Sequence, residues 1–112
     1  MSHKDEQWVF YKNIEGKLTF PGEVSRIMAY CDAAMCVVNE LEVDAIVPMH
    51  SHSAIQICYI AEGCFLFTID DVEKEVTKGD TLCIQDELKH GCVCLEKGVL
   101  VDFFTPMRED LL

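Results

Sequence analysis

Apolar and polar residues alternate with a period of two along most of this chain, as they do in strands that bury one face. Turn-forming pairs such as Pro21-Gly22 and Glu62-Gly63 separate the alternating runs, and no long run has the helical period. The expected strands are residues 8–11, 23–30, 34–41, 53–61, 64–69, 73–77, 81–84, 91–95 and 99–104. Many short strands at this spacing predict an all-β sandwich or barrel.

The size of the chain fits one compact unit. It has 112 residues, of which 50% are hydrophobic, so we expect a single domain over residues 1–112. Seven cysteines are many for this length, but the number is odd and no pair has the CxxC spacing. Without an export signal they are expected to be free thiols, most of them serving as small buried hydrophobes.

The charge balance limits the possible partners. A formal net charge of −11 and a pI near 4.5 argue against nucleic acid and anionic membrane surfaces, which both require a basic face. A small anionic substrate stays possible, because a pocket can carry local positive charge. The polar N-terminus does not read as a signal peptide, and no apolar run reaches the roughly 18 residues of a membrane span. We therefore expect a cytoplasmic protein.

Three histidines stand where one site can gather them. His50 and His52 are two residues apart beside the start of an expected strand, and Gln56 follows with matching parity. His90 comes after a Gly-Asp turn and a strand, in position to close the site. The fourth histidine, His3, is set aside because its segment is expected to be disordered. Single histidines are more often surface or core residues, but this spacing favours a metal site.

The same residues resemble the two sequence motifs of the cupins. The run from His50 to Gln56, followed by Gly63, is similar to G-x5-HxH-x3-E-x6-G, and Gly79 followed by His90 is similar to G-x5-PxG-x2-H. The resemblance implies a cupin barrel (a jelly-roll, double-stranded β-helix) that holds a divalent metal ion on four side chains. These are His50, His52, Gln56 and His90.

Some positions depart from the cupin pattern, so we expect the two motif loops to have unusual shapes. The departing residues are Asp44 for the first glycine, Gln56 for glutamate, Gln85 for proline, Glu87 for glycine and Cys94 for asparagine. With Gln56 the ligand shell is electrically neutral, and the ion should act as a stronger Lewis acid. Zn, Ni, Fe, Co and Mn all suit these ligands, and the sequence does not choose among them.

A narrower resemblance covers nearly the whole chain. The ligand set, together with segments 25–30, 65–70 and 100–110, is similar to the small pectin-degradation cupins of the KdgF type. This resemblance implies a metal-dependent ring opening. Its substrates are 4,5-unsaturated uronic acids released from pectin or alginate, and its product is a linear keto-uronate. It further implies functional roles for Asp102, Phe104 and Arg108.

Each of these three residues also has a structural interpretation. Asp102 is expected to move protons between the ring hydroxyl and the carbon that ketonises; the alternative is a structural hydrogen bond. Phe104 shares its strand face and either shapes the pocket wall or packs in the core. Arg108 is expected to clamp a substrate carboxylate, and the alternative is a solvated pair with Glu109 or Asp110.

Two other function classes stay open. One is a non-catalytic sensor or binding module, since cupin barrels host many functions, and the altered Gln85 and Glu87 favour it somewhat. The other is an Fe(II) dioxygenase-like cupin, whose sites often use three histidines or two with a carboxylate. Small cupins commonly pair, so a homodimer is expected, with residues 8–11 as a candidate strand contact.

Overall fold

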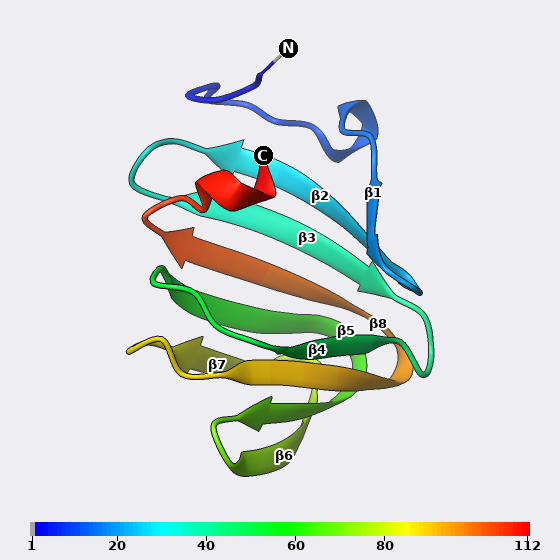
Figure 1. Cartoon of the computed structure of the whole chain (residues 1–112). Coiled ribbons are helices and arrows are strands. Elements are labelled where there is room, and N and C mark those ends of the chain that lie inside the picture. Colours follow the sequence, from blue (N-terminus) through cyan, green and yellow to red (C-terminus); the bar gives the residue numbers. More distant parts are fainter. Residues whose placement is uncertain (1) are drawn as a thin grey trace.

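The structure is a computed structural model that describes residues 2–112, and within them it is almost entirely antiparallel β-sheet (Figure 1). The strands are β1 (Lys17–Phe20), β2 (Glu23–Tyr30), β3 (Met35–Leu41), β4 (Ile46–His50), β5 (Ile55–Ile69), β6 (Val72–Thr77), β7 (Thr81–Ile84) and β8 (His90–Thr105). Two short 3-10 turns, η1 (Tyr11–Asn13) and η2 (Glu109–Leu111), flank them. No helix in residues 2–112 is long and apolar enough to cross a membrane.

The two longest strands organise the fold. β5 and β8 are antiparallel partners from Ile55↔Thr105 to Ile69↔His90. Their register shifts three times between Ile60 and Phe65, and such irregularities bend and twist a strand pair. The first half of β5 and the second half of β8 therefore share one layer with β1, β2, β3 and β7. The other halves share the second layer with β4 and β6.

Glycines let the two backbones approach closely at this bend. A Cβ atom on Gly98 would overlap the carbonyl oxygen of Glu62, and Gly63 has φ +88°. The residue pattern predicted two shorter strands in place of each long strand. Residues 53–61 and 64–69 were expected in place of β5, and residues 91–95 and 99–104 in place of β8. Backbone pairing continues across the bend and joins each pair into one long strand.

Alternation along the strands separates a core face from an outer face, as on β3, where buried and half-buried residues alternate over its whole length. The buried apolar residues form two clusters, one centred on Leu41, Ile60 and Phe65 and one on Met35 and Phe104. All seven cysteines are free, and the four buried ones are Cys58, Cys64, Cys92 and Cys94. The expectation of free thiols is therefore confirmed.

The predicted strand at residues 8–11 is wrong. Trp8 is 78% exposed and Phe10 is 56% exposed, the segment has no strand partner, and its end enters η1. The prediction rested on the apolar side chains of this segment alone, and in the structure most of them face solvent. The expectation of a disordered segment around His3 is also wrong. His3 Nε2 lies 2.9 Å from the carbonyl oxygens of Ile27 and Met28, on β2.

Two strands were missed. β1 is an edge strand whose residues are exposed except for half-buried Phe20, and its alternation covers only four residues, Lys-Leu-Thr-Phe, which is short for a strand signal. β4 contains Pro48, which is uncommon within strands, and its only partner is β8. Both strands nevertheless matter here, because β1 lines the cavity described below and β4 ends at His50.

The C-terminal tail lies across the open end of the first layer. In Figure 1 the turn η2 sits above β2 and β3. Met107 and Leu111 pack against the cluster that contains Met35 and Phe104. This packing holds Arg108 beside the cavity.

Candidate metal centre and cavity

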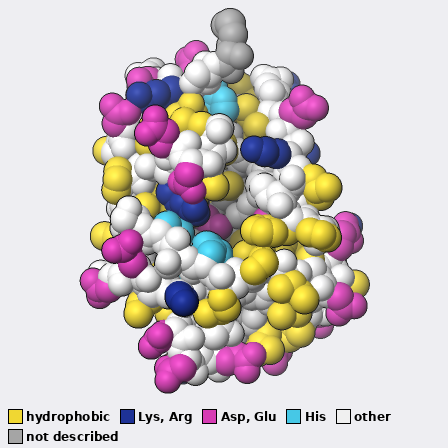
Figure 2. Space-filling model, in the orientation of Figure 1, with side chains coloured by type: hydrophobic (Ala, Val, Ile, Leu, Met, Phe, Trp, Pro, Cys, Tyr) yellow, Lys and Arg dark blue, Asp and Glu magenta, His cyan; other side chains and the backbone are white. Residues whose placement is uncertain are grey.

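A cavity of about 580 Å³ lies between the two apolar clusters. Phe67 and Leu100 line it from one cluster, and Val37 and Phe104 from the other. Figure 2 shows a hollow on this face, with histidine, acidic and basic side chains at its edge. An apolar cavity with a few converging polar groups is the usual form of a small-molecule site.

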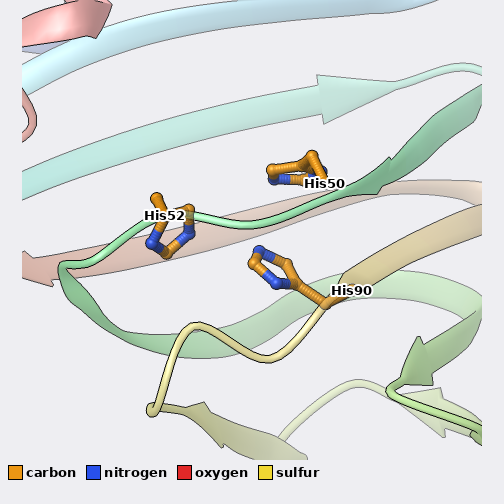
Figure 3. A group of neighbouring side chains, drawn as sticks. All are labelled: His50, His52 and His90. Carbon is orange, nitrogen blue, oxygen red and sulfur yellow. The ribbon is translucent and has the colours of Figure 1, made fainter.

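Three histidines converge beside the cavity, and two of them, His50 and His90, line it (Figure 3). His50 ends β4, His52 follows in the next loop, and His90 begins β8, where it pairs directly with His50. Their ring centroids are 4.3 to 5.9 Å apart, and one ligand atom from each lies within 4.8 Å of the others. The spacing that suggested a shared site in the sequence thus corresponds to a compact cluster.

Backbone carbonyl groups orient all three imidazoles. The Nδ1 atoms of His50, His52 and His90 lie 2.8 to 2.9 Å from carbonyl oxygens two residues away in the chain. A carbonyl oxygen only accepts, so each Nδ1 carries the hydrogen and each Nε2 keeps its lone pair. His90 Nε2 is buried and has no hydrogen-bond partner in the described chain. Burial also lowers the pKa of His90 to about 4, which keeps it neutral at pH 7.

Gln56 completes the cluster. Its Nε2 donates to Asp102 Oδ1 at 2.8 Å, which turns its Oε1 toward His52 Nε2 at 2.9 Å. Two acceptor atoms then face each other, an arrangement that a cation among them would stabilise. Together with the unpartnered His90 Nε2, this contact fits a divalent transition metal ion held by three imidazole nitrogens and one amide oxygen.

Asp102 lies next to this cluster on the inward face of β8. It is 8% exposed and accepts hydrogen bonds from Gln56 Nε2 and from Asn39 Nδ2, each at 2.8 Å. Burial raises the pKa of Asp102 above its usual value, although the hydrogen bonds and the nearby Arg108 oppose the shift. A carboxyl group with a raised pKa and defined partners is suited to proton transfer.

Phe104 and Arg108 form the neighbouring wall. The ring of Phe104 packs edge-on against His52 at 5.4 Å, and Arg108 Cζ lies 5.1 Å from the centre of the Phe104 ring. One guanidinium nitrogen of Arg108 donates to Asp110 at 2.8 Å, as the alternative interpretation expected. Its Nε, however, is buried without a partner in the described residues, which leaves one donor free beside the cavity.

Two cysteines near the cavity are protonated at neutral pH. Burial raises the pKa of Cys92 to about 12, and it raises that of Cys58 still further. Both side chains are buried members of the apolar cluster that contains Leu41, Ile60 and Phe65, so they serve as packing groups. This agrees with the predicted role of most cysteines in the chain.

The opposite wall carries polar residues that were not predicted from the sequence: Thr19, Glu23, Ser25 and Asn39. One signal for them was present. Asn39 shares strand parity with Val37 and Leu41, so it is a polar residue on the core face of an expected strand. Such a residue needs a hydrogen-bonding partner inside the fold, and Asp102 is that partner.

Comparisons with known proteins agree in sequence and in structure. The family described as "Cupin domain" matches residues 37–104. The pectin degradation protein KdgF of Dickeya dadantii (strain 3937) is 36% identical over 90 residues, which cover 78% of this chain and 81% of that protein. An RmlC-like cupin from Shewanella frigidimarina NCIMB 400 superposes with a TM-score of 0.91 at 30% identity over 96% of both chains. KdgF from Halomonas sp. superposes with a TM-score of 0.90 at 25% identity, over 95% of this chain and 98% of that one.

Proposed function

The chain belongs to the cupin domain family, and on this premise we propose that it is a metal-dependent catalyst that opens the ring of 4,5-unsaturated uronic acids to linear keto-uronates. The substrate class comes from the similarity to KdgF of Dickeya dadantii, whose name assigns that protein to pectin degradation. One observation carries the proposal: Gln56 joins Asp102 to the histidine cluster within a single cavity.

The residues that would hold the ion are His50, His52, Gln56 and His90. All four are neutral donors, so none of the ion's charge is cancelled by its ligands. When bound, a divalent ion supplies Lewis acidity toward an oxygen atom of the substrate. The amide of Gln56 also keeps its second function, which is to hold Asp102 in place through Nε2.

Arg108 binds the carboxylate of the sugar acid in this proposal. Its buried Nε is an unused donor, and the guanidinium is stacked beside Phe104, which fixes its plane. Charge-assisted hydrogen bonds from arginine to carboxylate are among the strongest polar contacts in proteins. Arg108 thereby gives local positive charge to a chain whose net charge is −11.

Asp102 transfers the proton. It removes the proton from the hydroxyl group on C1, the bond between C1 and the ring oxygen breaks, and C1 becomes an aldehyde. The electron pair of that bond stays on the ring oxygen and leaves an enolate at C5 and C4. Asp102 then returns its proton to C4, and a ketone forms at C5. The product is an isomer of the substrate, and no other reactant is consumed.

The variant Asp102→Asn tests this assignment. An amide has nearly the same shape but cannot accept the C1 hydroxyl proton, so general-base catalysis, typically a factor of about 10² to 10⁴, should be lost. The assay follows the loss of the ultraviolet absorbance of the unsaturated uronate in metal-loaded protein. Asp71→Asn, at an exposed hairpin position, is the matched control and should keep full activity. Full activity in Asp102→Asn would contradict the proposed role.

A homodimer is the assembly we propose. Residues 8–11 form no strand, so strand exchange there no longer supports the contact. The outer face of β5 and β8 offers a better surface, because Ile55, Ile57, Tyr59 and Phe103 are each 41% to 46% exposed on it. We expect light scattering to give twice the 12.7 kDa mass of one chain, and Ile57→Lys to give the single mass. A wild-type mass of one chain would contradict the dimer.

The compartment we propose is the cytoplasm. Seven free cysteines in one short chain suit a reducing environment, where none is driven into a disulfide. Cys83 is exposed and would be the first to react in an oxidising compartment.

A further inference from the structure

A buried carboxyl group on the cavity wall has no part in the mechanism above. Glu23, the first residue of β2, is 7% exposed and lines the cavity. Its Oε1 accepts a hydrogen bond from Thr19 Oγ1 at 2.5 Å. No lysine or arginine within residues 2–112 forms an ion pair with it. A buried carboxyl without a cationic partner destabilises a fold unless other donors satisfy it.

Glu23 is one end of a polar strip across the cavity wall. Thr19 Oγ1 lies 3.2 Å from Ser25 Oγ, Ser25 donates to Asn39 Oδ1 at 2.5 Å, and Asn39 donates to Asp102. The strip therefore crosses β1, β2 and β3 and ends at the carboxyl group assigned to proton transfer on β8. A ligand that lies along this strip can contact Glu23 at one end and Asp102 at the other.

Apolar side chains lie beside the strip, so it concentrates hydrogen-bonding groups along one line of the wall. Ile27, Val37 and Leu100 line the same cavity and offer no hydrogen bonds. Burial raises the pKa of Glu23, and the nearby Asp102 adds to this shift while the Thr19 hydroxyl opposes it. In either protonation state the Glu23 carboxyl can accept a hydrogen bond from a hydroxyl group of a ligand.

We propose that Glu23, oriented by Thr19, binds hydroxyl groups of the sugar acid and makes the cavity specific for polyhydroxylated substrates. The class of ligand rests on the function proposed above. A site that hydrogen-bonds a hydroxyl group discriminates strongly against analogues that lack it, because its own polar groups are then left unpaired. Arg108 recognises the carboxylate end of the ligand, and Glu23 recognises the hydroxylated end.

Two probes that do not react separate hydroxyl recognition from carboxylate recognition. D-glucuronate carries both features, whereas tetrahydropyran-2-carboxylate has the ring and the carboxylate without hydroxyl groups. Titration calorimetry of metal-loaded wild-type protein and of Glu23→Gln measures the dissociation constant for each probe. We expect Glu23→Gln to weaken D-glucuronate binding about tenfold or more, as for a hydrogen bond to a charged group. Binding of tetrahydropyran-2-carboxylate should stay within twofold.

Two further variants test whether weaker binding comes from loss of the Glu23 hydrogen bond or from the loss of any carboxylate. Thr19→Val keeps the side-chain shape but removes the donor to Glu23, so it should weaken D-glucuronate binding in the same direction by a smaller factor. Glu73→Gln, on the exposed strand β6, removes a carboxylate outside the cavity and should bind both probes like wild type. Equal weakening of both probes by Glu23→Gln, or no weakening of either, would overturn the inference.

The turnover assay with unsaturated uronate distinguishes failure of the Glu23 inference from failure of the proposed function. If unsaturated uronate is turned over and Glu23→Gln raises KM at least tenfold with little change in kcat, the inference holds. If Glu23→Gln has wild-type KM, the inference fails and the proposed function stands. If there is no turnover but Glu23→Gln still weakens D-glucuronate binding selectively, the proposed function fails and the recognition site stands. Without turnover or selective binding, both fail.

Discussion

Gln56 stands where the cupin motif carries a glutamate, and its surroundings explain the amide. Its Nε2 donates to Asp102 at 2.8 Å. A glutamate at position 56 would put a second carboxylate oxygen beside that of Asp102, and one of the two groups would then have to hold a proton. The amide instead supplies one donor to Asp102 and one acceptor to the metal cluster. The departure from the motif thus allows a carboxyl group to stand next to the ligands.

His90 makes the stability of the metal-free protein depend on pH. Its pKa is lowered to about 4 in the folded state, against an ordinary value near 6.5. Between these values the unfolded chain binds more protons, so His90 adds stability above pH 6.5 that is lost as the pH falls toward 4. We expect the stability difference between wild type and His90→Gln, from urea unfolding, to shrink by up to about 1.4 kcal/mol per pH unit across this range.

The difference in stability between wild type and His90→Gln separates the contribution of His90 from that of other titrating groups. Glu23 and Asp102 have raised pKa values, so they act in the opposite direction, but they are present in both proteins. A stability difference that stays constant from pH 7 to pH 4 would show that His90 does not carry the effect.

Some site residues could be predicted from their spacing and others could not. His50, His52 and His90 combine a recognisable spacing with a rare side chain. Glu23 lacks both, because a glutamate at the start of a strand usually faces solvent. Its burial depends on the pairing of β2 with β1, and β1 has only four residues, too few for a strong strand pattern.

At the scale of elements, the two motif loops keep the backbone shape that glycine would favour. Asp44 takes the place of the first glycine of the first motif and has φ +69°. Glu87 takes the place of the second glycine of the second motif and has φ +53°. A left-handed backbone is uncommon for residues other than glycine, which agrees with the expectation of unusual loop shapes at these two positions. The backbone conformation is left-handed despite the side chains, because strand pairing on both sides fixes the loop ends.

Glu87→Gly tests this interpretation. A left-handed conformation costs a non-glycine residue about 1–2 kcal/mol, and glycine loses about 0.5–1 kcal/mol through its greater freedom in the unfolded chain. We expect Glu87→Gly to raise the free energy of unfolding of metal-free protein by about 0.5–1 kcal/mol, measured with urea. Glu87→Ala keeps the Cβ atom and should give no such gain. Equal stability of the two variants would contradict the interpretation.

Strand prediction was most accurate at β2 and β7. Residues 23–30 and 81–84 agree with β2 and β7 to the residue. It failed at residues 8–11, which form no strand, at β1, a four-residue edge strand that pairs only with the adjacent β2, and at β4, whose pairing with β8 joins distant parts of the chain. The bend in the β5 and β8 pair could not be predicted either. In the sequence, each half of these strands has the pattern of a separate strand, and only the folded sheet joins the halves.

At the scale of the whole molecule, the bend brings the chemistry together. β8 carries His90 at its start and Asp102 near its end, and these positions lie in different layers. The bent pair β5 and β8 directs both side chains into the cavity between the layers. The sheet supplies most walls of the cavity, and the C-terminal tail adds Arg108, while a single domain over residues 1–112 stays a prediction.

Ring opening is proposed to require an ion at the histidine cluster. The most direct test removes metal with a chelator and adds back Zn, Ni, Fe, Co or Mn ions in steps, while the rate of loss of unsaturated uronate is followed by ultraviolet absorbance. We predict that the rate starts at the spontaneous value, rises with the ion added and levels off at one ion per chain. The same titration of His50→Ala and His90→Ala should show no rise. A rate that never exceeds the spontaneous value with any ion, or one that is already full in stripped protein, would contradict the account.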